Sequence, residues 1–91
     1  MAVLVKLPTI LRPHAGGEPS VQGAGSTLRE VLQDLERRYP GLTAGVLSDQ
    51  GDLHRFVNVY VNDEDVRYTG SLDTELRKGD TVSILPAVAG G

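Results

Sequence analysis

The chain contains no cysteine and no tryptophan, and it has only one phenylalanine and one methionine. Without cysteine it has no disulfide, no thiolate ligand for a metal and no cysteine nucleophile. Aromatic residues make up 4% of the sequence, which predicts a core of aliphatic side chains. Short domains without cysteine are common in reducing compartments, so we expect a cytoplasmic protein.

Positive charge is also scarce, because 9 lysine and arginine residues stand against 12 aspartate and glutamate residues, for a net charge of −3. Nucleic acids and anionic membrane surfaces bind proteins with a surplus of basic residues, so neither is an expected partner. The apolar run at the N-terminus is too short for a signal peptide, and no segment is long enough to span a bilayer. The composition favours a soluble protein that docks on other proteins.

A helix that begins at Thr27 is the clearest element of what we expect to be a single domain. Thr27 and Glu30 have the spacing of a capping box, in which each side chain accepts a hydrogen bond from a backbone N–H near the helix start. The apolar residues that follow have helical spacing and form one stripe: Leu28, Val31, Leu32 and Leu35. The sequence Tyr39-Pro40-Gly41 ends the helix.

Strands are expected on both sides of this helix in the chain. Their predicted ranges are 2–7, 18–22, 55–61 and 81–85, with a short strand at 66–68 after a polar turn at 62–65. The segments 9–17 and 42–53 are expected to be loops. One helix on one face of a mixed sheet of about four to five strands makes an α+β domain.

Strand alternation separates an inner from an outer set of side chains. In the range 55–61, three valines point inward towards the helix stripe, which leaves Phe56 and Tyr60 on the solvent face. The same alternation turns Leu4 and Leu85 outward. If these strands are neighbours, the four residues form a partner-docking patch; the alternative is scattered apolar residues, which are normal on a protein surface.

No constellation in the chain predicts a self-contained active site. His14 and His54 are too isolated for a metal site or a catalytic triad, so no metal ligand is assigned. The Asp63-Glu64-Asp65 run lacks the spacing of a calcium loop and is interpreted as a solvated turn. Gly23-Ala24-Gly25 precedes a helix but lacks the third glycine of a dinucleotide fingerprint. We therefore expect no bound cofactor and no enzymatic activity.

The last five residues form a distinct segment, which we call the tail (residues 87–91), after a domain body of residues 1–86. Pro86 stops the sheet ladder, and the side chains of Val88, Ala89, Gly90 and Gly91 are small or β-branched. Such a segment can reach about 16 Å at roughly 3.3 Å per residue and can enter a narrow channel. The Gly91 carboxylate is the expected reactive group; adenylation by ATP and displacement of AMP by a sulfide donor would convert it to a thiocarboxylate. The alternative is a disordered end without a function.

Four segments carry a resemblance to a known family. They are Leu85 to Gly91, Pro8 to His14, His54 to Asn58, and Tyr60 to Arg67. Together with the order of elements, they resemble the ubiquitin-like sulfur carriers of the MoaD/ThiS family, and most closely the branch that serves cysteine biosynthesis. The resemblance implies a β-grasp fold and a carboxylate at Gly91 that an E1-like enzyme adenylates with ATP and converts to a thiocarboxylate, with Gly90 as its partner in the motif.

The resemblance also implies partners. The sheet face near the tail would contact the activating enzyme, a PLP-dependent cysteine synthase would accept the sulfur, and a metal-dependent peptidase would release the product. Alternatives within the same chemistry are the small subunit of molybdopterin synthase and a sulfur donor for secondary metabolism. Two other classes remain open, namely a ubiquitin-like protein modifier and a passive binding module.

Overall fold

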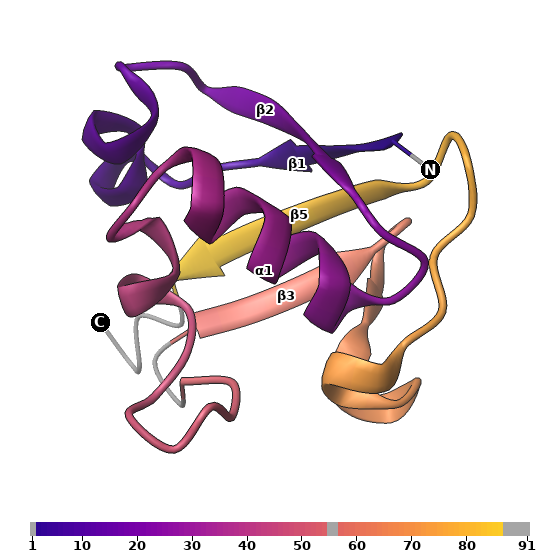
Figure 1. Ribbon diagram of the computed structural model, residues 1–91. Helices are drawn as coiled ribbons and strands as arrows, with labels where there is room; N and C mark the ends of the chain where they lie inside the picture. The colour runs from indigo at the N-terminus through magenta and orange to yellow at the C-terminus, as the bar shows by residue number, and fades with distance from the viewer. Residues whose placement is uncertain (1, 55–56, 87–91) are drawn as a thin grey trace.

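The computed structural model describes residues 2–54 and 57–86 (Figure 1). Five strands form one sheet: β1 (Ala2–Lys6), β2 (Ser20–Ala24), β3 (Val57–Val61), β4 (Glu64–Asp65) and β5 (Thr81–Pro86). One α-helix, α1 (Leu28–Arg38), follows β2. The connections contain four 3₁₀ helices: η1 (Thr9–Ala15), η2 (Leu42–Gly45), η3 (Val66–Tyr68) and η4 (Ser71–Asp73).

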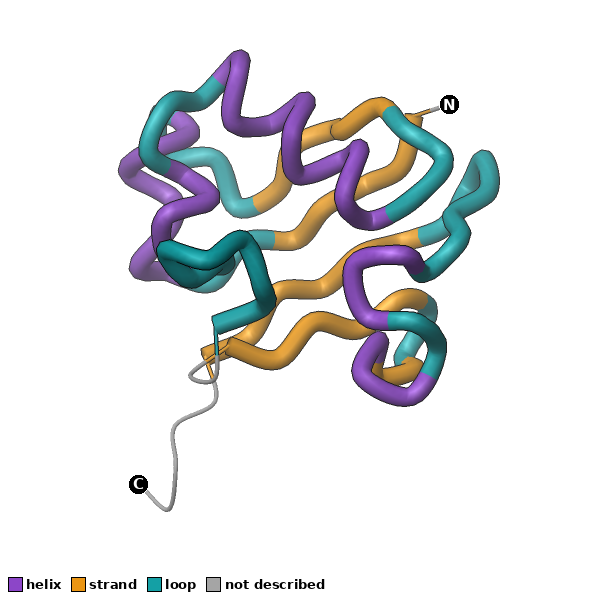
Figure 2. The backbone as a smooth tube through the Cα atoms, turned by 60° about the horizontal axis from the view of Figure 1, so that its bottom comes forward, coloured by secondary structure: helices purple, strands orange, loops and turns teal. Residues whose placement is uncertain are grey.

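The strand order in the sheet is β2-β1-β5-β3-β4. The central pair, β1 and β5, is parallel, whereas the other neighbours are antiparallel. Helix α1 lies across one face of this mixed sheet, as Figures 1 and 2 show from two directions. This arrangement is the ubiquitin-like β-grasp, and it confirms the predicted fold class.

The core lies between α1 and the covered face of the sheet. The predicted inward sets of β1, β3 and β5 are all buried, at 9% exposure or less, and so is the whole apolar stripe of α1. All the buried apolar side chains in the described ranges are aliphatic, which confirms that expectation. At Gly23 in β2 the sheet comes so close to α1 that a Cβ atom there would lie 2.7 Å from Cγ1 of Val31.

The start of α1 differs slightly from the predicted capping box. Thr27 is the N-cap, and its hydroxyl accepts a hydrogen bond from the Glu30 amide at 3.2 Å. The Glu30 carboxylate accepts from the backbone N–H of Ser26 at 2.8 Å, so the second bond of the box goes one residue earlier than predicted. The helix has 11 residues, and no helix in the described chain is long and apolar enough to cross a membrane.

Several predicted loops and strand boundaries were wrong in detail. The predicted loop at 9–17 contains η1, because Leu11 and Ala15 are buried and hold one helical face against the core. The predicted strand at 66–68 is η3, since the Asp65 carboxylate caps the Arg67 amide at 2.9 Å and turns the chain. Strand β2 begins two residues later than predicted, while positions 55 and 56 of the predicted third strand lie outside the described residues.

Candidate functional site

The reactive end of the candidate site lies outside the described residues, and the structure defines its base. Gly91, Gly90, Ala89 and Val88 belong to the tail, and Phe56 of the predicted patch is likewise not described. Strand β5 ends at Pro86, which pairs with Val57 of β3. The tail therefore starts from a strand that has neighbours on both sides, β1 and β3.

Arg67 forms hydrogen bonds with the start of β3, beside the base of the tail. Its guanidinium donates to the Asn58 side-chain oxygen at 2.6 Å and to the backbone carbonyls of Val57 at 2.8 Å and His54 at 3.5 Å. The outer neighbour of β3 is β4, which has only two residues and pairs with Tyr60 and Val61. Arg67 thus supplies hydrogen bonds along a part of β3 that has no strand on that side.

The open face of the sheet carries the described part of the predicted patch. Residues that face each other across the strands form a row in which Lys6 lies beside Ser83, and Ser83 lies beside Tyr60. Leu85, which is 47% exposed, follows Ser83 on the same face, one step closer to the tail. Tyr60 and Leu85 are therefore diagonal neighbours, as a shared docking surface requires.

Leu4 occupies a different part of this face. It is 38% exposed and pairs with Thr81 at the opposite end of β5. Leu85 comes four positions after Thr81, which corresponds to about 13 Å along the strand. The polar row of Lys6 and Ser83 lies between the two leucines, so the structure does not bring Leu4 into contact with the residues beside the tail.

A groove of about 710 Å³ crosses the open face next to the base of the tail. We call it the sheet-face groove, and its lining includes Lys6, Arg12, Tyr60, Asp63, Ser83 and Leu85. Pro19 also lines the groove, together with atoms of the otherwise buried residues Leu7 and Ile84. Strands β1, β3 and β5, the helix η1 and the β3–β4 turn all contribute, so the groove exists only in the folded domain.

Two cations and one anion line the sheet-face groove. Arg12 uses its Nε to donate to the Leu7 carbonyl at 3.3 Å, and this bond orients the guanidinium. Asp63 lies in the two-residue turn between β3 and β4, where it and Asn62 have φ values of 73° and 51°. Such left-handed pairs are typical of tight hairpin turns. The turn is shorter than the polar turn predicted at 62–65, because Glu64 and Asp65 pair with β3 as strand β4.

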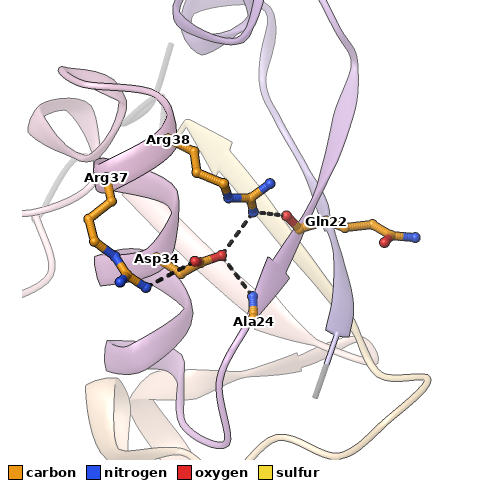
Figure 3. Close-up of polar contacts among 5 residues, drawn as sticks. All are labelled: Gln22, Ala24, Asp34, Arg37 and Arg38. Atoms are coloured by element: carbon orange, nitrogen blue, oxygen red, sulfur yellow. Dashed lines mark hydrogen bonds and ion pairs between the residues drawn. The ribbon is translucent and has the colours of Figure 1, made fainter.

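Figure 3 shows how side chains of α1 form hydrogen bonds with backbone groups of the edge strand β2. The Asp34 carboxylate accepts from the Ala24 amide at 3.0 Å and from Arg38 at 2.9 Å. Arg38 also donates to the Gln22 carbonyl. The hydrogen bond from Ala24 is the main cause that lowers the pKa of Asp34. This cluster blocks backbone groups of an edge strand that could otherwise pair with another chain.

The other carboxylates with a lowered pKa also hold the fold together. Hydrogen bonds from Thr43 and Gly41 lower the pKa of Glu36, which ties the end of α1 to η2. Hydrogen bonds from the Arg77 amide and the Asn62 side chain lower the pKa of Asp80 before β5. None of these three acids lines the sheet-face groove, so their perturbation reflects architecture rather than catalysis.

The side chains considered for metal binding do not gather in space. Over residues 2–54 and 57–86, no three His, Cys, Asp or Glu side chains form a group that could hold a metal ion. His14 lies in η1 and His54 precedes β3, while Asp65 of the acidic run caps η3. The acidic run thus contributes to a hairpin and a helix cap.

Sequence reasoning missed Lys6 and Arg12 as members of the site. Lys6 had a usable signal, since it is the one charged residue in the first strand and alternation placed it on the outer face. Arg12 had none, because it comes from a segment predicted as a loop and reaches the groove through the fold of η1.

A family comparison decides the relationship of this chain. The model of the ThiS family matches residues 5–91, which includes the end of β1, the other four strands, α1 and the tail. The chain belongs to the ThiS family. The predicted resemblance is thereby confirmed, and the ThiS match extends through Gly91.

Two relatives are similar to this ThiS-family chain over almost its entire length. The sulfur carrier protein CysO of Mycobacterium tuberculosis is 57% identical over 93 residues, with all of both chains covered. The crystal structure of the Amycolatopsis orientalis BexX/CysO complex contains a chain with a TM-score of 0.90 and 55% identity, covering 98% of this chain and 99% of that one. In that crystal structure a CysO is in a complex with BexX.

A third relative carries a different name. The small archaeal modifier protein 3 of Haloferax volcanii is 42% identical over 66 residues, which is 72% of this chain and 71% of that protein. The ThiS-family domain is therefore shared by proteins named as sulfur carriers and by one named as a modifier.

Proposed function

We propose that this protein is a cytoplasmic sulfur carrier of the CysO type and a co-substrate of other enzymes rather than an enzyme itself. The observation that carries the proposal is the 57% identity to the CysO sulfur carrier over the full length of both chains. The position of the tail base supports it, because β5, the last strand before the tail, is held between β1 and β3 in the folded body. A carrier needs such a rigid body behind a narrow reactive end.

The proposed chemistry takes place at the carboxylate of Gly91. One carboxylate oxygen attacks the α-phosphorus of ATP on an E1-like enzyme, which forms an acyl-adenylate and releases pyrophosphate. A sulfide donor then adds to the acyl carbon, and AMP leaves with the bridging oxygen. The product is a thiocarboxylate, in which one oxygen of the original carboxylate has been replaced by sulfur. The carrier itself binds no cofactor, and the ATP is consumed by the activating enzyme.

The proposed acceptor is a PLP-dependent cysteine synthase. The thiocarboxylate sulfur attacks the aminoacrylate that this enzyme forms, and the acyl group ends on the cysteine amine after rearrangement. A metal-dependent peptidase then hydrolyses the new amide bond and restores the Gly91 carboxylate. Gly90 and the small residues Ala89 and Val88 let the tail enter the narrow sites of these enzymes, since they present little side-chain bulk.

Intact-mass measurement tests the proposal directly. The purified chain is incubated with ATP, a sulfide donor and the E1-like enzyme of the same organism, and we expect the mass gain that corresponds to sulfur replacing one oxygen. A chain that lacks Gly91 is the matched control, and it should melt at the same temperature without gaining mass. No gain in the complete chain would contradict the carrier function, whereas a lower melting temperature of the control would show that Gly91 is structural.

A protein modifier is the second candidate, and the 42% identity to an archaeal modifier protein favours it. Here a lysine amine of another protein would displace AMP from the same acyl-adenylate and form an isopeptide bond. Tryptic digests of cells that produce the chain distinguish the two functions, because only a modifier leaves remnants of the tail on lysines. Affinity purification separates the remaining alternative, in which the stable partner would be the large subunit of a molybdopterin synthase.

A further inference from the structure

The sheet-face groove contains positive charge that the fold does not use. Among residues 2–54 and 57–86, the ion-paired basic side chains are Arg29, Arg37 and Arg38, all on α1. Arg67 is engaged with the start of β3. By contrast, the Lys6 ammonium group has no ion pair within the described chain. The terminal nitrogens of Arg12 likewise have no partner there, because only its Nε is bonded.

This unused charge stands out against the charge of the whole chain. The protein carries a net charge of −3, yet Lys6 and Arg12 outnumber the single carboxylate of Asp63 in the groove. A local positive field on an acidic protein attracts an anionic group of a partner and orients it. One Asp or Glu side chain of a partner would neutralise this excess of one positive charge.

The surroundings of the two cations define the rest of the partner surface. Tyr60 and Leu85 lie on one side of the groove and add half-exposed apolar area. The hydroxyl group of Ser83 lies between Tyr60 and Lys6, and that of Ser20 lies on the other side of Lys6, so both can take part in hydrogen bonds with a partner. The groove thus suits an extended peptide segment with one acidic side chain next to apolar ones.

The position of the groove indicates which protein supplies this segment. Leu85 lines the groove and is separated from the tail only by Pro86. Because five residues can extend about 16 Å at most, an enzyme that reacts with Gly91 must approach within that distance of the groove. An enzyme large enough to enclose the tail therefore lies against the open sheet face as well.

From these observations we propose that the sheet-face groove binds a segment of the activating enzyme through an Asp or Glu side chain that pairs with Lys6 and Arg12. This inference rests on the proposed carrier function and adds the chemistry by which the enzyme recognises the carrier. The ion pair forms beside Tyr60 and Leu85, where the docked enzyme excludes water and strengthens the attraction. Lys6 and Arg12 act in recognition and take no part in the reaction at Gly91.

Charge reversal at Lys6 tests the proposal, with a matched control on the same chain. Lys6→Glu and Lys78→Glu make the same change in charge, but Lys78 lies in the exposed turn before β5, at the other end of that strand. Calorimetric titration with the E1-like enzyme should show that Lys6→Glu raises Kd by at least about tenfold, whereas Lys78→Glu changes it by less than about twofold. Lys6→Arg should bind like the wild type because the positive charge is kept.

A second pair of variants keeps the proposal testable if Lys6→Glu does not fold. Arg12→Gln removes the charge, and Arg77→Gln is its control at an exposed position outside the groove. The Arg12→Gln variant should weaken binding, and its affinity should depend less on salt than that of the wild type, since one ion pair is lost. Melting curves of all variants check that the domain stays folded.

Several outcomes would overturn the groove assignment. Equal effects of Lys6→Glu and Lys78→Glu would show that only the overall charge matters. An NMR shift of the Lys6 ammonium group when the chain is shortened to Pro86 would identify the protein's own tail as the occupant. Self-association that Lys6→Glu abolishes would identify a second copy instead.

The mass measurement separates the two proposals. If the wild type gains sulfur while Lys6→Glu binds the enzyme normally, the groove inference fails and the carrier function stands. If the wild type gains no sulfur, the carrier function itself fails.

Discussion

The two faces of the sheet differ although the same strands build both. On the covered face, Val59 and Ile84 are each 1% exposed and pack against the aliphatic stripe of α1. On the open face, their neighbours Tyr60 and Leu85 stay partly exposed next to Lys6, in a groove lined by charged, hydroxyl and apolar groups. Successive residues of one strand thus serve different purposes.

Under the proposed function, the covered face provides stability and the open face provides recognition of a partner, within a chain of 91 residues. The covered face contributes the buried apolar area that holds the domain together. The open face contributes little to folding, so its composition is free to suit a partner. Substitutions on the two faces should therefore affect different measurements.

The largest expected effect compares two consecutive residues of β5. Ile84→Ala removes a buried side chain and should lower the free energy of unfolding by about 2–5 kcal/mol in urea denaturation. Leu85→Ala should change it by less than about 0.5 kcal/mol, while it weakens binding of the activating enzyme by about tenfold. Equal stability losses at both positions would show that the open face also supports the fold.

A second prediction concerns the close approach of β2 to the helix. Gly23→Ala places a methyl group 2.7 Å from Cγ1 of Val31, whose β-branched side chain has little freedom to move. We expect a loss of about 1–3 kcal/mol in the free energy of unfolding. The double variant with Val31→Ala should lose less than the sum of the single variants, because the clashing atom is then absent. Strict additivity would argue against the contact.

A smaller effect is expected at Arg67, which forms hydrogen bonds with the start of β3, next to the base of the tail. Arg67→Ala should cost about 1 kcal/mol, since the bonds to Asn58 and Val57 are lost from an exposed side chain. Hydrogen exchange should accelerate at the start of β3 and leave α1 unchanged. Arg67→Lys keeps the charge but cannot bridge these acceptors, so it should behave like the alanine variant. If amide hydrogens at the start of β3 exchange as slowly in Arg67→Lys as in the wild type, a positive charge at this position is enough to hold the start of β3.

The smallest predicted effect is a dependence of stability on acidic pH. The pKa of Asp80 in the folded protein is lowered from 3.8 by hydrogen bonds from Arg77 and Asn62. The unfolded state therefore takes up its proton first as the pH falls. The stabilisation is complete above the unfolded pKa and is lost as the pH drops through the lower folded value.

Asp80→Asn should remove this contribution to the pH dependence. Thermal melts from pH 6 to about pH 3 should show a smaller decline than in the wild type, and Asp63→Asn serves as a control in the neighbouring turn. An unchanged slope in Asp80→Asn would indicate that the dependence comes from Glu30, Asp34 and Glu36, whose pKa values are lowered as well.

The fold could be predicted from the sequence where a repeated spacing reports burial. The valines at 57, 59 and 61 and the helical stripe from Leu28 each identified a buried face, and both lie in the core. The helix η1 could not be predicted in this way, because Arg12-Pro13 and Gly16-Gly17 are typical of turns, and only Leu11 and Ala15 connect it to the core. At Tyr68, 89% exposure follows from a cap by Asp65 that overrides β propensity.

The site was predicted less completely than the fold. The outward direction of Tyr60 and Leu85 followed from alternation, but the neighbours of each strand did not. The separation of Leu4 from Leu85 depends on the register of β1 against β5, which is set by contacts between the two ends of the chain. The contribution of Arg12 depends on η1 in the same way, and these long-range arrangements leave no local pattern.

The parallel pairing of β1 with β5 has a consequence for synthesis. The last strand fills the centre of the sheet, between strands made earlier, so a ribosome that has released only residues 1–80 has produced the sheet as two unconnected strand pairs, β2-β1 and β3-β4. Neither the groove nor the base of the tail exists until β5 arrives. If the proposed function holds, a truncated chain lacks both the groove and the strand end that the activating enzyme would contact.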